Sequence, residues 1–564
     1  MTRESIRSLC AAAILAIAVV ALYAQTASFA FLRFDDPDYT FANAFVRNGL
    51  TGSGVVSAFA DFRHGAVWMP VTWLSYMADI AFFGPGACPH HVVNVLLHLA
   101  NAVLLLLLLR RLAQDRTSGV WLALAVGLWA LHPQRVEAVA WIASRKELLW
   151  AFFSLLGLLA WRRNHLVRAT VCCALACMSK PTAMVFPFLA ILIDRIPNEA
   201  PRRRRWAYVP LFLLAVATGL AAVYSQTHPE GMAAKDLFYA GFVERSINAL
   251  VAVGLYLGQL ICPFGLHLDY RAIPGEWPLN LGLGLGALVV WAVLMGWLIG
   301  RLRSRIALWA FLWFGLALAP TLGIFGSFGE HARADRFLYV PMMALPLALA
   351  FVGERWGRRA YGVVAAFGLL FVGCSWPLIR SYRSDESAFQ RTIACDADHG
   401  RALAHVGEAR CAAGDLDAGI ELLRHSRAVR PRAATDGKLA YALMRRGRTA
   451  DWEEIRTVCA PYVAKPEWDE KGQALEALGT AELRARDWTA AATHLVLSTR
   501  APARFYSAED AFLKLAFAWQ NGGRRAEALK LFERLANSTR ADISARATSA
   551  LGAIARSPNV LLFW

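Results

Sequence analysis

Three carboxylates lie close together directly after the first long apolar run of the chain. The run extends from Leu9 to Leu32, and the sequence Phe34-Asp35-Asp36-Pro37-Asp38-Tyr39 follows it. Carboxylates near a membrane surface can act as a general base, hold a divalent cation such as Mg²⁺ or Mn²⁺, or simply be solvated. Asp35 and Asp36 are adjacent, so in an extended segment their side chains point to opposite sides and cannot do the same task.

Lysines are rare in the apolar part of the chain, where arginine supplies most of the positive charge. Lys occurs at only three positions before residue 438, namely Lys146, Lys180 and Lys235. All three fall on the outer side in the topology derived below, against the positive-inside preference. Lys146 and Lys180 therefore require a local anion, and a lipid phosphate is the natural one at that depth. The alternative is that each side chain extends along apolar surface to reach water.

Polar side chains also follow one face of the second apolar run. His91, Asn94 and His98 are spaced i, i+3, i+7, which places them on one side of a helix. Polar residues on a spanning helix face protein or water, so this side is predicted to look inward. Hydrogen bonding between helices and a role in a functional site are both consistent with this pattern.

The composition predicts that the bilayer is the solvent for much of the chain. Hydrophobic residues make up 57% of the 564 residues, charged residues only 18%, and the mean hydropathy is +0.39. The formal net charge of +17 comes from short basic clusters between apolar runs, which argues against a nucleic-acid partner. The ten Cys form no CxxC pair, so they are interpreted as small buried hydrophobes.

Arginine-rich joints between the apolar runs predict which ends face the cytoplasm. The first run follows Arg3 and Arg7, and its length favours a signal anchor. The alternative is a cleaved signal peptide, because Ser28-Phe29-Ala30 resembles a cleavage site. Placing every arginine cluster inside gives eleven spans, with the N-terminus inside and everything after Arg380 outside. The clusters are Arg110-Arg111, Arg162-Arg163 with Arg168, Arg202 to Arg205, Arg301/Arg303/Arg305, and Arg355/Arg358/Arg359.

Two apolar segments need special treatment in this topology. The stretch from Thr170 to Ile193 is predicted to form two short helices that meet at Lys180-Pro181, because proline breaks the hydrogen-bond ladder. The stretch from Ile247 to Phe264 is predicted to be an interfacial or re-entrant helix, because counting it as a span would put the following arginines outside.

After Tyr382 the composition changes to Ala, Arg, Glu and Asp with helical periodicity, which predicts a domain boundary near residue 380. We therefore expect a multispanning domain at 1–380 and a helical-repeat domain at 381–564. Small residues and a closing proline recur with the spacing of tetratricopeptide repeats, and the segment 434–471 is a degenerate unit. The three patterns are Gly407, Gly414, Gly419, Ser426 and Pro431; Gly479, Ala491, Ser498 and Pro502; and Ala516, Gly523, Ala528 and Phe532.

Several motifs together resemble those of a known family. They are Asp35-Asp36, the Asn-x-x-x-His that ends at His98, the block His-Pro-x-x-Val-Glu-x-Val-Ala-Trp-Ile-x-x-Arg-Lys from His132 to Lys146, Ser-Lys-Pro around Lys180 followed by Pro187 and Asp194, Asp269-Tyr270, and the segment from Asp335 to Pro341. Over nearly the whole chain, this set resembles the transmembrane and tetratricopeptide repeat-containing O-mannosyltransferases and their bacterial relatives. The family is similar to the GT-C glycosyltransferases, so the resemblance implies an all-α fold, with a membrane domain of GT-C type followed by an α-solenoid.

The resemblance also implies roles for individual residues. Asp35 would be the base that deprotonates an acceptor hydroxyl, and Asp36 would orient the acceptor or hold Mg²⁺ or Mn²⁺. Attack on the anomeric carbon would proceed with inversion, and the lipid phosphate would leave as an anion. Asp335 departs from the family pattern, which more often has Glu there. The positions expected to bind the substrates are His91, His98, His132, Glu137, Arg145, Lys146, Lys180, Arg336 and Tyr339.

The expected function is thus transfer of a sugar from a polyprenyl-phosphate donor to an acceptor hydroxyl, of protein Ser/Thr or an envelope glycan, on the periplasmic side of a bacterial inner membrane. The repeats would hold an acceptor protein or partner subunits. The alternative is a non-catalytic membrane scaffold whose repeats organise envelope or pilus assembly. A transporter of the same lipid-linked sugar is less consistent with the sequence, because the spans contain few polar residues.

Overall fold

The computed structural model describes most of the chain as helix, and no β-strand occurs in the residues that it describes. These residues are 3–62, 64, 67–113, 117–196, 205–227, 242–270, 282, 285–286, 288–293, 296, 306–324, 333–350, 357–463, 471–500 and 508–562. The predicted arginine clusters at 202–204 and 301–305, Arg355 and Lys235 lie outside them. The chain divides into two compact units, Met1–Arg391 and Thr392–Trp564.

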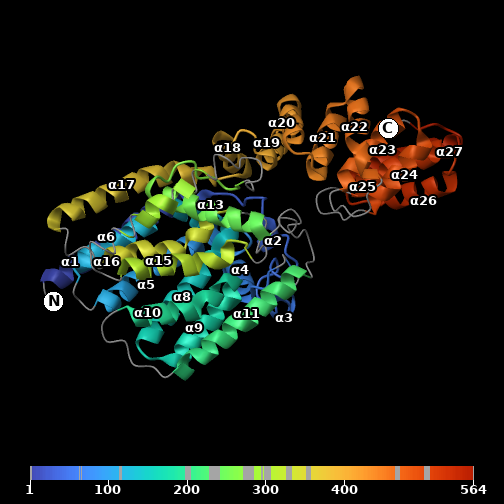
Figure 1. Ribbon diagram of the computed structural model, residues 1–564. Helices are drawn as coiled ribbons and strands as arrows, with labels where there is room; N and C mark the ends of the chain where they lie inside the picture. Colours follow the sequence, from blue (N-terminus) through green and yellow to red (C-terminus); the bar gives the residue numbers. More distant parts are fainter. Residues whose placement is uncertain are drawn as a thin grey trace. The chain divides into compact units, whose positions relative to one another are not determined.

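The first unit consists of packed helices joined by short 3₁₀ turns (Figure 1). Its longer described helices are α1 (Arg3–Tyr23), α4 (Pro70–Phe83), α5 (Ala87–Ala113), α6 (Gly119–Ala130), α8 (Arg145–Arg162), α9 (Leu166–Ser179), α10 (Phe186–Arg195), α11 (Val209–Thr227), α13 (Phe242–Ile261), α15 (Ile306–Leu318) and α17 (Gly357–Ser381). The boundary between the two units falls within α18 (Asp385–Cys395). The short ones that matter below are α2 (Asp36–Tyr39), α3 (Gly52–Ala60), η2 (Pro133–Arg135), α7 (Val136–Ala140), η3 (Ile142–Ser144), η4 (Pro181–Val185), η5 (Arg205–Tyr208) and η8 (Asp335–Leu338).

Four of the described helical segments are long and apolar enough to cross a membrane. They are Glu4–Ser28, Ala87–Ala113, Arg205–Thr227 and Arg359–Ser381. Other apolar helices have only 10–17 residues, such as Gly119–Ala130, Leu166–Ser179 and Leu308–Thr321. At 1.5 Å per residue, these are shorter than a hydrocarbon core of about 30 Å. A membrane domain is thus supported, while the count of eleven spans stays a prediction.

The break predicted at Lys180-Pro181 is confirmed. Helix α9 ends at Ser179, the turn η4 follows, and α10 begins at Phe186. The segment predicted to be interfacial forms α13, whose apolar stretch Arg245–Ile261 is below the length of a span. Whether α13 lies in the interface stays a prediction.

The predicted topology places two loops outside before α8, a first loop from Arg33 to His91 and a second loop from His132 to Glu147. Both are folded segments, and they pack against each other. In the first loop, α3 and α4 form a core with Val46, Trp73 and Met77, and Ile142 of the second loop completes it. The hydroxyl of Tyr76 donates a hydrogen bond to the carbonyl oxygen of Ile142 at 2.6 Å. The second loop, η2–α7–η3, is buried almost throughout. The residues of both loops are therefore held by packing and hydrogen bonds.

The second unit consists of antiparallel helix pairs followed by a terminal helix. The pairs are α19 (Gly400–Ala412) with α20 (Leu416–Val429), α21 (Ala433–Arg446) with α22 (Thr449–Val463), α23 (Lys471–Arg484) with α24 (Trp488–Thr499), and α25 (Ala508–Asn521) with α26 (Arg525–Ala536), before α27 (Ala541–Arg556). Four pairs and a terminal helix match the number expected. The degenerate segment still forms a helix pair, and Pro502 lies outside the described residues.

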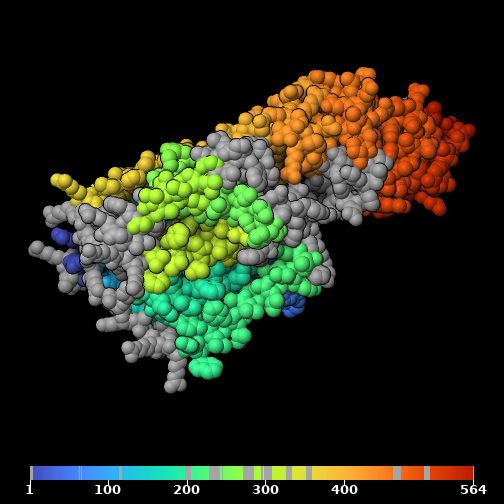
Figure 2. Space-filling view, in the orientation of Figure 1, coloured from blue at the N-terminus to red at the C-terminus, as the bar shows by residue number. Residues whose placement is uncertain are grey.

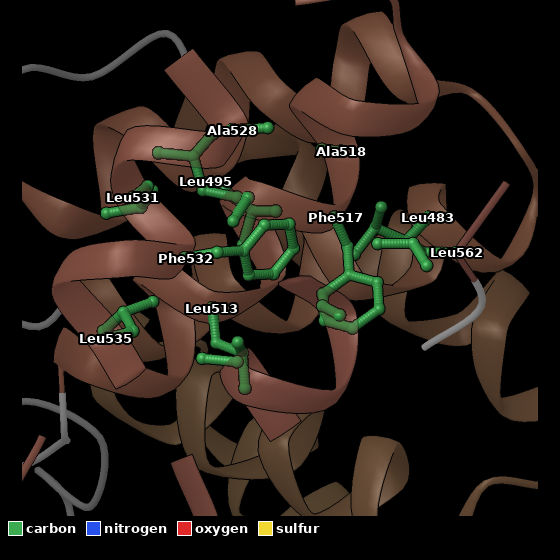
Figure 3. Close-up of a cluster of buried hydrophobic side chains, with 14 of the residues drawn as sticks. Leu483, Leu495, Leu513, Phe517, Ala518, Ala528, Leu531, Phe532, Leu535 and Leu562 are labelled. Atoms are coloured by element: carbon green, nitrogen blue, oxygen red, sulfur yellow. The ribbon is translucent and has the colours of Figure 1, made fainter. Parts of the chain in front are cut away.

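Equivalent contacts recur in this unit, as expected for a repeat architecture. Ser426 donates a hydrogen bond to the carbonyl oxygen of Gly400, and Ser498 makes the same contact with Gly472, at 2.6 and 2.9 Å. In the last repeats, Leu495, Phe517 and Phe532 from three different helices meet in one core (Figure 3). Each pair therefore buries its apolar face against its neighbours.

Close helix approach predicts opposite effects for two Gly→Ala substitutions. A Cβ at Gly419 would lie 2.7 Å from the carbonyl oxygen of Gly407 and collide with Cys411, whereas a Cβ at Gly552 meets nothing within 4 Å. Gly419→Ala should lower the free energy of unfolding by roughly 1–2 kcal/mol, because overpacking outweighs helix propensity. Gly552→Ala, the control, should raise it by up to about 1 kcal/mol. Hydrogen exchange of α19, α20 and α27 in the full chain measures both, and equal protection in the two variants would contradict the assignment.

Candidate functional site

The two adjacent carboxylates of the first loop have different surroundings. The Asp36 side chain is fully buried and accepts hydrogen bonds from the backbone N–H groups of Leu32, at 2.7 Å, and Ala143, at 2.9 Å. Burial raises the pKa of Asp36 to about 8, against the two backbone hydrogen bonds. Asp36 thus ties the end of the first span to the second loop. Since both of its oxygens already accept hydrogen bonds, we infer that it positions the loop.

Asp35 precedes α2 and is half-buried. Among the described side chains, none donates a hydrogen bond to its carboxylate. Its backbone carbonyl accepts from the N–H groups of Asp38 and Tyr39, so the turn that fixes Asp35 is closed by its own backbone. The two adjacent side chains differ in access, because Asp36 faces the interior and Asp35 is accessible. The tasks assigned to them stay predictions.

Lys146 lies at the start of α8 and reaches toward the first loop. Its Nζ donates a hydrogen bond to the hydroxyl of Tyr39 at 2.5 Å and lies 4.3 Å from the centre of that ring. Burial lowers the pKa of Lys146 to about 8, while the negative charge of Asp35 acts in the opposite direction. The side chain is half-buried and has no ion pair with a described carboxylate. Lys146 is therefore a cation that an anionic ligand can approach.

Lys180 and Arg336, which were also expected to bind the substrates, are paired inside the protein. Lys180 donates a hydrogen bond to Oε1 of Glu147, and Arg336 binds Glu137 through its side chain and, at 2.8 Å, through its backbone N–H. All four side chains are largely buried. Phe337 lies under both cations, with Lys180 and Arg336 each 5.1 Å from its ring centre.

These charged side chains lie close enough to influence one another and form one charge cluster. Asp35, Glu137 and Glu147 each favour the charged form of Lys146, and Arg336 opposes it. The cluster joins the first loop, the start of α8, the turn after α9, and η8. With three carboxylates and the cations of Lys146, Lys180 and Arg336, its formal charges balance, and only Asp35 and Lys146 lack a hydrogen-bonded ion-pair partner among the described residues.

Arg145, also predicted to bind phosphate, is committed to internal contacts. It is fully buried, donates to Oδ1 of Asn94 at 2.8 Å, and lies 2.5 Å from Oδ2 of Asp79. Its guanidinium also donates to the Ser75 hydroxyl at 3.0 Å and to the carbonyl oxygen of His90 at 2.8 Å. These contacts link α4, α5 and α8, so Arg145 holds the helices that present Lys146.

The remaining predicted substrate-binding residues are buried in packing contacts. His98 forms hydrogen bonds with the hydroxyl of Tyr339, at 2.7 Å, and with the carbonyl oxygen of Ala130, at 3.0 Å. His132 bonds the carbonyl oxygen of Leu260 in α13 at 3.1 Å, and burial lowers its pKa to about 3. His91 packs edge-on against Phe29 with ring centres 6.0 Å apart. Of the predicted site residues, Asp35 and Lys146 are therefore accessible, and the others form the buried framework around them.

Some residues of the cluster were not singled out from the sequence. Tyr39 ends the acidic segment that begins at Phe34, and Glu147 directly follows the predicted residue Lys146, which is the only signal that they carry. Asp335, where the family pattern more often has Glu, accepts hydrogen bonds from Tyr270 at 2.9 and 3.0 Å. Burial raises the pKa of Asp335 to about 8, and the charge of Glu137 adds to this effect.

A divalent cation has no ready-made ligand set in the part of the chain that the structure describes. There, no group of three or more His, Cys, Asp or Glu side chains is placed to hold a metal ion. A cation on Asp36 would compete with the two backbone hydrogen bonds of its carboxylate. Dependence on Mg²⁺ or Mn²⁺ remains a prediction.

The fold and site define an all-helical protein with apolar helices of membrane-spanning length, a buried charge cluster and helical repeats. No protein-family model matches the chain. It is similar to the protein O-mannosyl-transferase Tmtc1 of Drosophila melanogaster, 34% identical over 157 residues, which are 26% of this chain and 17% of that protein. It is 24% identical over 304 residues to the protein O-mannosyl-transferase F38B6.6 of Caenorhabditis elegans, covering 51% of this chain and 42% of that protein.

The chain thus spans less than half the length of these curated relatives. They support the resemblance to the repeat-containing O-mannosyltransferases, at low identity and over part of the chain. Among solved structures, the crystal structure of yeast Tom70 aligns over 78% of this chain and 94% of that one, with 13% identity. Its TM-score of 0.21 is too low to support an argument about the fold.

The buried pair Lys180–Glu147 predicts strong coupling between the two residues. Lys180→Met leaves the Glu147 carboxylate buried without its cation, so it should lower the free energy of unfolding by about 3–5 kcal/mol. Glu147→Gln should also destabilise the protein, whereas the double variant should lose clearly less than the sum, because neither charge is left alone. Equilibrium unfolding in detergent measures the cycle. Additive losses would show that the two side chains are not coupled.

Proposed function

We propose that the chain is a membrane glycosyltransferase of GT-C type that moves a sugar from a polyprenyl-phosphate donor to an acceptor hydroxyl. One observation carries this proposal. Asp35 and Lys146 are half-buried, opposite in charge and electrostatically coupled, and neither is committed to an ion pair with another described side chain. A carboxylate and an ammonium in this arrangement are the groups that transfer from a phosphate donor requires.

Asp35 is the general base in this mechanism. An acceptor hydroxyl that hydrogen-bonds to its carboxylate loses its proton to Asp35 as the oxygen forms a bond to the anomeric carbon. The bond between that carbon and the phosphate oxygen breaks on the opposite side, so the configuration inverts. One carboxylate on the acceptor side is sufficient, because the leaving phosphate needs no proton.

Lys146 is the group that stabilises the leaving phosphate. Its ammonium is held by the Tyr39 hydroxyl, which accepts from it and leaves its other N–H groups for a phosphate oxygen. Lys180 and Arg336 are bound to carboxylates, so they contribute through the local field and hold the framework. Positive charge fixed in a partly desolvated site stabilises developing negative charge better than water does.

A lipid-linked donor also requires that the site be close to the bilayer. Asp36 accepts a hydrogen bond from the backbone N–H of Leu32, which lies four residues after the first candidate span ends at Ser28. The lipid tail can thus stay among the spans while the sugar meets a water-side acceptor. We further propose that the site faces the periplasm of a bacterial inner membrane, and that the repeats hold an acceptor protein or a partner subunit.

The relatives support the class of reaction, because both are named protein O-mannosyl-transferases. We therefore take mannose on a polyprenyl phosphate as the first donor to test, with protein Ser/Thr or an envelope glycan as the acceptor. Purified full-length protein in detergent is incubated with this labelled donor and an extract of the native membrane and envelope, and transfer of label is followed. Absence of transfer from a panel of polyprenyl-phosphate sugars would favour the scaffold alternative.

Asp35→Asn is the sharpest test of the mechanism. The amide keeps the size of the side chain but cannot take up the proton, so transfer should fall at least about a hundredfold, as loss of a general base does. Donor binding and the unfolding midpoint should stay unchanged. Asp38→Asn is the matched control, because Asp38 is exposed in the same loop, and it should keep full activity. Full transfer by a folded Asp35→Asn protein would remove Asp35 from the mechanism.

Donor binding should depend on pH through Lys146. Its folded pKa of about 8 means that the ammonium is charged below pH 8 and is lost as the pH rises through that value. Affinity for a polyprenyl-phosphate sugar should then fall by roughly tenfold or more between pH 7 and 9, as expected when a charged hydrogen bond is lost. The donor phosphodiester keeps its charge over this range, so the change reports on the protein.

Lys146→Arg separates Lys146 from other groups that titrate in the same range. Arginine stays charged, so its donor affinity should remain nearly constant up to pH 9. Asp36 and Asp335 also have pKa values raised to about 8, and both are unchanged in this variant. If the decline near pH 8 persists in Lys146→Arg, these carboxylates are responsible and the assignment to Lys146 is wrong.

A further inference from the structure

An apolar groove lies on the surface of the first unit, where α11 and η5 meet α10. Its volume is about 390 Å³, within the range of roughly 300–1,000 Å³ typical of ligand sites. Its apolar walls are formed by Ile191, Phe212, Leu213 and Val216. Arg205 and Tyr208 line the same groove at the start of α11. The lining is almost wholly apolar and Arg205 is exposed at its edge, so the groove fits the apolar chain of an amphiphile whose anionic head would meet Arg205 outside it.

The groove opens toward the lipid side of a candidate span. The segment Arg205–Thr227 is apolar and long enough to cross the membrane, and only 17% of its most apolar window is buried in the protein. Leu213 and Val216 are 64% and 60% exposed. In Figure 2, α11 forms an uncovered green surface on the face shown. Hydrocarbon is the solvent for such a surface, so an acyl chain is the natural occupant of the groove.

The polar end of the groove is built from fixed side chains. The Tyr208 hydroxyl donates a hydrogen bond to Oδ2 of Asp194 at 2.7 Å, and Nε1 of Trp161 donates to the same oxygen at 2.8 Å. The rings of Trp161 and Tyr208 also contact each other, with centres 5.0 Å apart. Asp194, a motif residue that the charge cluster does not use, thus fixes one wall of the groove beside Arg205.

Charge favours an anionic head at this end. Arg205 is exposed, and the sequence places three further arginines directly before it. Trp206 is 78% exposed, which suits the interfacial level of a bilayer. The groove also lies at the opposite end of the helices from the charge cluster, because α8 begins next to Lys146 and ends at Arg162, beside Asp194. Its occupant is therefore different from the proposed sugar donor.

We propose that this groove binds one acyl chain of an anionic phospholipid, whose phosphate is held by Arg205. The site is independent of the proposed glycosyltransferase reaction. Asp194 and Trp161 position Tyr208 as its wall, and the bound lipid joins α10 to α11 at the bilayer surface. In the predicted topology this is the cytoplasmic leaflet, where anionic lipids attract basic residues.

Native mass spectrometry of the detergent-solubilised full chain tests the proposal with palmitoyl-oleoyl phosphatidylglycerol, and with phosphatidylcholine of the same chains for comparison. One phosphatidylglycerol should be retained, about tenfold more strongly than phosphatidylcholine. Leu213→Trp fills the groove and should abolish this retention. The matched control is Leu220→Trp, which lies two turns along α11, is 67% exposed and does not line the groove. It should retain the lipid as the unmodified protein does.

Arg205→Glu tests the head group separately. It should reduce retention of phosphatidylglycerol by about tenfold and leave that of phosphatidylcholine unchanged. Equal retention of the two lipids by the unmodified protein, or equal losses in Leu213→Trp and Leu220→Trp, would overturn the proposal in favour of general annular lipid. The unfolding midpoint of each variant is measured in parallel. Since all three positions are exposed, it should not change.

Discussion

Charge buried at the edge of an apolar helical domain is the constraint on which the first unit depends. A carboxylate or ammonium removed from water is costly unless an opposite charge and hydrogen bonds replace the lost hydration. Glu137 and Glu147 meet this requirement for Arg336 and Lys180. Each pair joins segments far apart in the chain, so the loops can carry buried charge only when the helices around them are assembled. The pairs therefore specify the arrangement of the loops, whatever net stability they add.

The accessible charges at the candidate site are defined by this framework. Arg145 fixes α4 and α5 to the start of α8, and Asp36 fixes the first loop to η3. With these contacts made, Asp35 and Lys146 remain half-buried and without an ion-pair partner among the described side chains. A catalytic base and a phosphate-binding cation have to be held in this way, because groups that reorganise during the reaction lose much of their effect.

The repeat unit follows a different principle. Its helix pairs approach closely at Gly407, Gly419 and Gly479, where a Cβ would collide with the neighbouring helix. Its pairs pack against neighbouring pairs, and the Ser–Gly contact recurs in two of them, so this unit depends on neighbours in sequence. The first unit depends on pairs such as Glu137 and Arg336, 199 residues apart. The degenerate segment 434–471 illustrates the point, since α21 and α22 form there although the repeat pattern is weak.

The sequence by itself determined the features that arise from local pattern. Apolar runs, the proline after Lys180 and the small residues of the repeats were sufficient to predict a helical membrane domain, the break between α9 and α10, and four repeat units. It also indicated that the cations at positions 146 and 180 need anions, because charge at this depth cannot stay unpaired cheaply. Which anion each one meets was decided only by the tertiary structure. Lys180 and Arg336 find carboxylates 33 and 199 residues away, while Lys146 meets the Tyr39 hydroxyl and no carboxylate among the described residues. No local pattern encodes partners that the fold alone brings together.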